Sequence, residues 1–131
     1  MANAEQAAGA MGDCKVAVFH LHLGMRFSAQ LPDGLEDLGF CKKGEGGKFV
    51  ADGNLISGVG KLPFNTDGGG LCSNHPVNRG GMTKIIEAVR QLRGQAHPKV
   101  QVPNCDLAIA HGTGGLLGVR HAASTCILER V

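Results

Sequence analysis

The chain has 131 residues, the size of a single domain, and 43% of them are hydrophobic, as in soluble globular proteins. Its 13 basic and 11 acidic residues give a formal net charge of +2, which is too weak to indicate binding to nucleic acid or to an anionic membrane. The absence of Trp and Tyr removes two of the aromatic side chains on which unpaired bases stack.

The five cysteines are widely spaced and form no C-x-x-C pair, so the sequence gives no support for a structural zinc site. Residues 1–13 contain neither a basic region nor a long apolar run and do not resemble a signal peptide. No apolar stretch approaches the roughly 20 residues that span a bilayer. We therefore expect a cytosolic protein with reduced thiols and no bound metal.

The first half of the chain predicts a helix, a strand and a second short helix. Residues 3–11 are typical of a helix that begins with a capping box. Residues 16–23, VAVFHLHL, predict a strand with two apolar faces, which favours a central strand covered on both sides. Asp33 and Glu36 have the spacing of a capping signal for a short helix over residues 35–40 that ends near Gly39.

The middle of the chain predicts a Gly/Lys-rich loop over residues 42–61 with an edge strand at KFVADG, and then a short strand over 61–67 that enters a glycine turn. The clearest helix covers residues 81–93, where Gly94 marks its end. Apolar residues at helical spacing predict its buried face: Met82, Ile85, Ile86, Val89 and Leu92. Polar residues are expected to face away: Lys84, Glu87, Arg90 and Gln91.

The last part of the chain predicts a buried strand over 105–111, a turn over 112–118 and a final strand over 121–131. Helical segments therefore alternate with apolar strands along the chain. This order favours an α/β fold with a mixed central sheet and helices on both faces.

Four histidines are candidates for chemistry because each lies where a predicted strand or turn ends: His20, His22, His75 and His111. Binding sites in α/β sheets gather at strand ends, and imidazole moves protons near neutral pH. Glycines after His111 would expose backbone N–H groups, which can form an oxyanion hole. The alternative is that each histidine only holds its own turn. Cys72 and His75 are close enough in sequence to form a nucleophile pair, although a buried cysteine is usually a small hydrophobe.

Three segments in the order of one known family carry a resemblance. GGGLCSNHPVNRGGMTKIIEAVRQLRG resembles the thiolase segment that contains a G-H-P motif before a helix. QVPNCDLAIAHGTGGLLGVRHAASTCILER resembles the end of that fold, where a C-x-G loop joins two strands, and LEDLGFCKKGEGGKFVADG resembles the sterol-carrier and lipid-transfer branch. The resemblance covers roughly residues 35–130 and is weaker over 14–34. It implies that the whole chain is one C-terminal thiolase domain.

The resemblance implies acyl transfer at a coenzyme A thioester, with a carbon–carbon bond formed or cleaved and no further cofactor. In this family the histidine of G-H-P is thought to activate a cysteine nucleophile, and its match is His75. The cysteine of C-x-G matches His111, so an imidazole replaces the acid/base thiol, as in the sterol-carrier branch.

Further residues follow from the same alignment of motifs. The backbone N–H groups of Gly112 and Thr113 would line an oxyanion hole, because Thr113 matches the glycine of C-x-G. The sterol-carrier branch has an H-D-C-F motif where this chain has FHLHLGMRF, so His20 or His22 is present there without a cysteine.

A thiolase subunit has two similar halves, and the nucleophilic cysteine lies on the first. This chain resembles the second half, so the resemblance implies a partner chain that supplies the first half, or association with copies of itself. Two alternatives remain: a non-catalytic subunit that completes a partner, and a truncated product without activity. Residues 14–34, where the similarity is weakest, favour the second of these alternatives.

Overall fold

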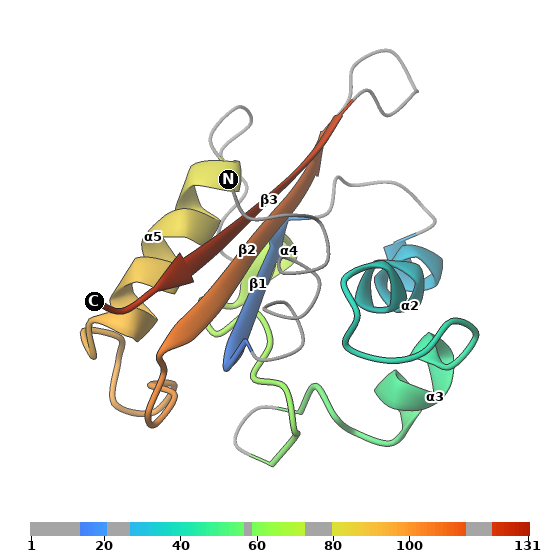
Figure 1. The fold of residues 1–131 in the computed structure, drawn as a ribbon, viewed down its shortest axis with the longest axis horizontal. Coiled ribbons are helices and arrows are strands. Elements are labelled where there is room, and N and C mark those ends of the chain that lie inside the picture. Colours follow the sequence, from blue (N-terminus) through green and yellow to red (C-terminus); the bar gives the residue numbers. More distant parts are fainter. Residues whose placement is uncertain (1–13, 21–26, 57–58, 73–79, 115–121) are drawn as a thin grey trace.

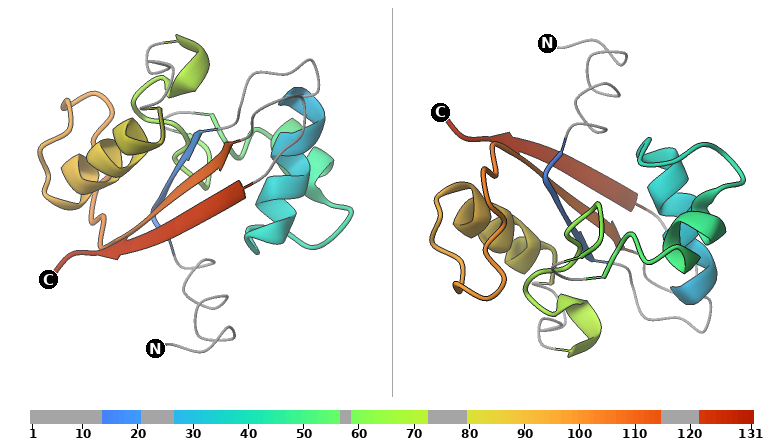
Figure 2. Two further views of the ribbon diagram at one scale, coloured as in Figure 1. Left: turned by 90° about the horizontal axis from the view of Figure 1, so that it is seen from above. Right: turned by 90° about the horizontal axis from the view of Figure 1, so that it is seen from below.

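A computed structural model describes residues 14–20, 27–56, 59–72, 80–114 and 122–131, which form three strands and four helices around one sheet (Figures 1 and 2). In chain order they are β1 (Val16–His20), α2 (Phe27–Asp37), α3 (Gly46–Ala51), α4 (Gly69–Cys72), α5 (Gly80–Leu92), β2 (Leu107–Gly114) and β3 (Ala122–Glu129). The helix predicted over 3–11 and residues 21–23 of the first predicted strand lie outside the described residues. No helix in the described ranges has both the length and the hydropathy that a membrane span requires.

The sheet is mixed, as predicted, and β2 is its central strand. β1 pairs with β2 in parallel, with Val16 opposite Ala108, and β3 pairs with β2 antiparallel along its whole length. The segment predicted as a short strand over 61–67 makes only an isolated bridge, in which Phe64 lies beside Ala17. Backbone bonds from Ala17 N to Pro63 O and from Asn65 N to Ala17 O hold this segment against β1.

Two apolar clusters lie on opposite faces of the sheet, because alternate residues of β2 enter different clusters. Ile109 joins the first cluster together with Leu35 of α2. Ala108 and Ala110 join the second, together with residues of α5. Figure 1 shows α5 on one side of the strands and α2 with α3 on the other. The two helical regions are therefore anchored on the sheet independently.

The helix predicted over residues 35–40 is longer than expected and begins earlier, at Phe27. The capping interpretation of Asp33 and Glu36 was wrong, because both lie inside α2. The predicted end was right: Gly39 has φ 78°, and Phe40 N donates to Leu35 O across it. That pair of features is a Schellman motif, in which a left-handed glycine satisfies the last carbonyls of a helix.

The edge strand predicted at residues 48–53 is wrong, because α3 occupies Gly46–Ala51. The carboxylate of Glu36 accepts a bond from Gly46 N at 2.8 Å, so a residue of α2 caps the first turn of α3. Phe49 and Val50 pack against the first apolar cluster. A carboxylate ten positions earlier in the chain thus binds the first turn of this helix, a contact that local spacing does not reveal.

The extent of α5 was predicted within one residue at each end, and its termination at Gly94 was right. Gly94 has φ 66°, and Gln95 N donates to Arg90 O, as in the other Schellman motif. The predicted faces of this helix were wrong in part, although Arg90 is exposed and Leu92 is buried, as predicted. Three polar residues expected in solvent are 1–5% exposed: Lys84, Glu87 and Gln91. Two apolar residues expected in the core are 58% and 44% exposed: Met82 and Ile86.

Candidate functional site

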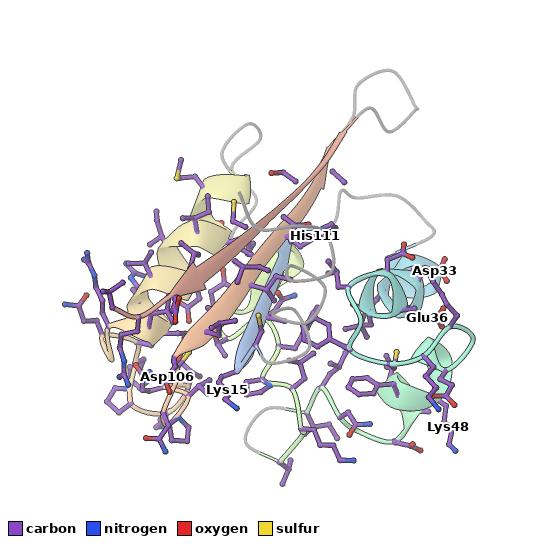
Figure 3. All side chains as sticks on the ribbon, viewed as in Figure 1. Lys15, Asp33, Glu36, Lys48, Asp106 and His111 are labelled. Atoms are coloured by element: carbon purple, nitrogen blue, oxygen red, sulfur yellow. The ribbon has the colours of Figure 1, made fainter. Side chains whose placement is uncertain are left out.

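The candidate site is centred on β2, where His111 lies inside the strand and not at its end. The predicted strand ended at His111, but β2 continues to Gly114 because β3 pairs with it up to Ala122. Three residues of the predicted turn are therefore strand residues, and 115–118 lie outside the described part. Figure 3 places His111 toward the end of the sheet that is remote from Asp106.

The imidazole of His111 is half-buried and held across the sheet by Thr125. Its Nδ1 lies 2.8 Å from Thr125 Oγ1, with the direction of donation set by the tautomer. Burial lowers the pKa of His111 below its ordinary value, and the carboxylate of Asp37 opposes that shift. A histidine with a lowered pKa is mostly neutral at pH 7, so it can accept a proton or donate one ring N–H.

Gly112 joins the predicted site to β1 and to a small cavity. It pairs with His20 on one side and with Ser124 on the other. The cavity has a volume of about 120 Å³ and includes Gly112 and His111 in its lining. Residues of α5 and of the two strands complete the lining: Gly81, Lys84, Ile85, Ala110, Ser124 and Cys126. Thr113 follows in β2, opposite Ala123, so its backbone also belongs to the sheet.

The structure brings only part of the predicted site together. The backbone of His20 lies beside that of Gly112, so β1 and β2 place two predicted residues next to each other. His75 and His22 lie outside the described residues, and their positions relative to His111 stay predictions. His75 is flanked in sequence by α4, which ends at Cys72, and by α5, which begins at Gly80.

The cysteines that the structure describes in detail have the properties of core residues. Cys14 and Cys105 are buried, and Cys126 is partly buried. Burial, followed by the nearby Asp106 carboxylate, raises the pKa of Cys105. Burial is also the main cause of the raised pKa of Cys41. A raised pKa disfavours the thiolate, so neither Cys41 nor Cys105 is an activated nucleophile.

A polar cluster that sequence reasoning missed lies between α5 and the loop before α4. Lys84 Nζ donates to Asp67 Oδ2 at 2.7 Å, and Thr66 Oγ1 donates to Glu87 Oε1 at 2.7 Å. Thr66 and Asp67 were predicted in a short strand over residues 61–67, and Lys84 and Glu87 on a solvent-exposed helix face. The sequence did contain a signal for this cluster, because Lys84, Glu87 and Gln91 are spaced three and four residues apart on one face of the helix. That spacing indicates a polar stripe, but it does not show which segment of the chain covers the stripe.

Comparison with known proteins places this arrangement in a family. The model of the thiolase C-terminal domain-like family matches residues 2–130. The chain belongs to the thiolase C-terminal domain-like family. The match includes the segments that carry His75 and His111, and it confirms the resemblance drawn from the three motif-bearing stretches.

The similar curated proteins are longer than this chain. A benzoylsuccinyl-CoA thiolase subunit of Thauera aromatica is 43% identical over 95 residues, which are 70% of this chain and 24% of that subunit. An acetyl-CoA acetyltransferase of Methanothermobacter thermautotrophicus is 40% identical, with 64% of this chain and 21% of the relative covered. Bovine sterol carrier protein 2 is 39% identical, with 67% and 16% covered. The chain thus spans about a quarter or less of these relatives.

Proposed function

We propose that this chain is the C-terminal portion of a thiolase-type acyltransferase that forms or cleaves a carbon–carbon bond at an acyl-CoA thioester. The observation that carries the proposal is the family match over residues 2–130, together with relatives named as a thiolase subunit and an acetyl-CoA acetyltransferase. The coenzyme A thioester is the substrate, and the reaction needs no other cofactor. We place this activity in the cytosol.

The proposed roles divide the chemistry between this chain and a partner. A cysteine of the partner, a thiolase first half, receives the acyl group as the thioester bond to coenzyme A breaks. His75 takes the proton of that cysteine thiol and gives it to the coenzyme A thiolate that leaves. His111 moves a proton at the α-carbon, for which a mostly neutral imidazole is suited. The backbone N–H groups of Gly112 and Thr113 bind the thioester oxygen. His20 or His22 is a further proton-transfer group. The proposed fold has helices on both faces of the sheet, in keeping with the two apolar clusters.

The outward face of α5 supports a partner chain. Met82 is 58% exposed and Ile86 44% exposed, and they lie one turn apart on the same helix. Apolar side chains grouped on a surface favour association, because burying them removes apolar area from water. We propose that a first-half chain covers this face, and that copies of this chain cover it when no such partner is present.

The activity test compares the isolated chain with its complex. Consumption of acetoacetyl-CoA in the presence of coenzyme A is expected only after a cysteine-bearing first half is added. In that complex, His75→Ala should lower the rate by about 10²–10⁴, as for a lost general base. His97→Ala is the matched control, because His97 lies in the loop after α5, where its ring accepts a bond from Lys99 N. Turnover by the isolated chain that disappears in Cys72→Ser would contradict the proposal.

A non-catalytic subunit is the second candidate, and the exposed Met82 and Ile86 side chains also favour it. Native mass measured with and without a first-half partner separates the candidates. A complex that forms but stays inactive supports the non-catalytic subunit. A chain that stays a stable monomer at micromolar concentration and binds no first half contradicts both, and leaves the truncated product.

A further inference from the structure

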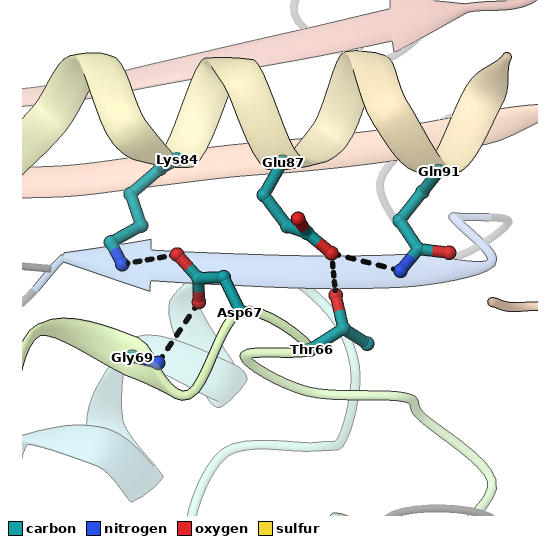
Figure 4. A network of polar contacts seen from close by, with 6 residues as sticks. All are labelled: Thr66, Asp67, Gly69, Lys84, Glu87 and Gln91. Atoms are coloured by element: carbon teal, nitrogen blue, oxygen red, sulfur yellow. Dashed lines mark hydrogen bonds and ion pairs between the residues drawn. The ribbon is translucent and has the colours of Figure 1, made fainter. Parts of the chain in front are cut away.

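The loop over residues 66–68, which leads into α4, is joined to α5 by the polar contacts of Figure 4. The side chains of Lys84 and Asp67 are only 1% and 7% exposed, and their ion pair spans 17 positions of the chain. Asp67 uses its other oxygen to accept a bond from Gly69 N at 2.9 Å. One turn further along α5, Glu87 accepts bonds from Thr66 and from Gln91. The loop is thus held at two adjacent positions by directional contacts.

Stability alone is a weak explanation for this pair. Two charges removed from water lose their hydration, and apolar residues of similar volume are often as stable at such positions. An ion pair with a shared backbone hydrogen bond differs from apolar packing in one respect, because it fixes the direction and distance of two chain segments. The contact therefore specifies where the loop lies on the helix.

The segments that it fixes are those on either side of residues 73–79. α4 begins at Gly69, the residue whose N–H is bound by Asp67, and ends at Cys72. α5 begins at Gly80, one turn before Lys84. Lys84 also lines the cavity that includes His111 and Gly112. A single side chain thus contacts the loop before α4 and borders the part of β2 that carries the predicted site.

We propose that Lys84 and Asp67 are positioning residues, which set where the two chain ends around His75 lie relative to His111 and Gly112. This inference rests on the proposed function, because the proposed function is what assigns His75 and His111 to catalysis. Neither residue needs to contact substrate. Lys84 holds Asp67, Asp67 holds the first turn of α4, and α5 carries Lys84 against the sheet.

The test uses NMR on the full chain without any acyl-CoA. Three proteins are compared with the wild type: Asp67→Asn, Lys84→Met, and the double variant Lys84→Met with Asp67→Leu. Lys43→Met is the matched control, because it removes a lysine from an ion pair whose side chains are 70% and 67% exposed. The readouts are amide exchange at Gly69 and at Ile109, and the ring signals of His75, with those of His97 as the internal reference.

In both single variants we expect amide exchange at Gly69 to be faster than in the wild type, by a factor about tenfold or more larger than the factor at Ile109. Such a difference is the mark of a local opening. The His75 signals should shift, whereas those of His97 stay in place. The double variant separates stability from positioning. Its apolar side chains should restore the unfolding midpoint, but they cannot restore the directional contacts that place the loop on α5. Its Gly69 exchange and His75 signals should remain altered although its stability recovers.

Two results would overturn the proposal. One is a double variant that recovers both the stability of the wild type and its His75 signals. The ion pair would then contribute to stability alone and would not position the segments around His75. The other is a folded Asp67→Asn protein with unchanged Gly69 exchange and His75 signals, which applies even if the double variant does not fold. No acyl-CoA enters these measurements. A chain without activity in any complex would therefore contradict the proposed function and leave this inference standing.

Discussion

On the α5 side of the sheet, an ion pair and amide hydrogen bonds join the helix to its loops, whereas on the α2 side apolar side chains provide most of the contact. Lys84 and Asp67 are almost fully buried on the first side. Leu35 and Ile109 are 0% exposed on the second, where the half-buried carboxylate of Glu36 accepts a bond from Gly46 N at the start of α3. Apolar packing tolerates small shifts, while paired charges do not. The comparison indicates that the α5 side, which borders the candidate site, is the side built for fixed geometry.

The largest expected effect comes from breaking the buried ion pair. Lys84→Met leaves the Asp67 carboxylate buried without its cation, so we expect the free energy of unfolding to fall by about 3–5 kcal/mol. Urea unfolding at neutral pH measures it. Lys43→Met removes a lysine from an exposed pair and should cost about 1 kcal/mol or less. Equal effects in the two variants would remove the distinction between the buried and exposed pairs.

The apolar side is tested by Leu35→Ala, which leaves a cavity beside Ile109. We expect a loss of about 2–5 kcal/mol in the free energy of unfolding, from the lost burial and the incomplete collapse of the cavity. Val59→Ala is the control, because Val59 is 81% exposed and should change stability by about 0.5 kcal/mol or less. Leu35 belongs to the first cluster and Lys84 lies on α5, whose apolar residues belong to the second, so their effects should add to within about 0.5 kcal/mol. Strong coupling would show that the two sides are not independent.

A smaller effect is expected where α3 begins against α2. A Cβ at Gly46 would lie 2.5 Å from Pro32 O and 2.8 Å from Glu36 Oε1, whereas a Cβ at Gly47 meets nothing within 4 Å. Gly46→Ala should therefore cost about 1–3 kcal/mol through strain, measured as a lower urea midpoint. Gly47→Ala is the matched control in the same helical turn and should be neutral or slightly stabilising. Similar midpoints for the two variants would contradict the close contact of α2 and α3.

The elements that could be predicted from the sequence are those whose determinants are local. α5 was found because its apolar spacing and its terminal Gly94 lie within one segment. α3 was missed because Glu36, which caps it, belongs to the preceding helix. The end of β2 was missed because its antiparallel partner, β3, sustains the strand past His111. Contacts between distant segments decided each of the missed features.

The same distinction applies to the candidate site. Family resemblance supplied His75 and His111, which no pattern within the sequence separates from structural histidines. The buried faces of α5 could not be predicted, because what covers Lys84 is a loop 17 positions earlier in the chain. A polar stripe and a solvent-exposed face have the same spacing, and only the covering loop distinguishes them. Where polar residues recur at helical spacing beside a glycine-rich loop, both a buried and an exposed face should therefore be considered.

The smallest expected effect depends on pH and concerns the carboxylate that caps α3 on the apolar side. Backbone N–H groups of Gly44 and then Gly46 donate to Glu36 and lower its pKa, with a smaller contribution from Lys43. A carboxyl group whose pKa is lowered in the folded state stabilises the protein above its unfolded pKa. That contribution disappears as the pH falls through the folded pKa. Wild type should therefore be more stable than Glu36→Gln at pH 7, and the difference should shrink below the ordinary pKa of glutamate.

Urea unfolding of both proteins at pH 7, 5, 4 and 3 measures this difference directly. His111, whose lowered pKa also makes acid unfavourable for the fold, is present in both proteins, so its effect cancels in the comparison. Glu45→Gln is the control, because Glu45 is the N-cap residue of α3 but makes no capping bond with its side chain. A difference between wild type and Glu36→Gln that is constant from pH 7 to 3, or that grows in acid, would show that the charge of Glu36 does not hold α3 against α2.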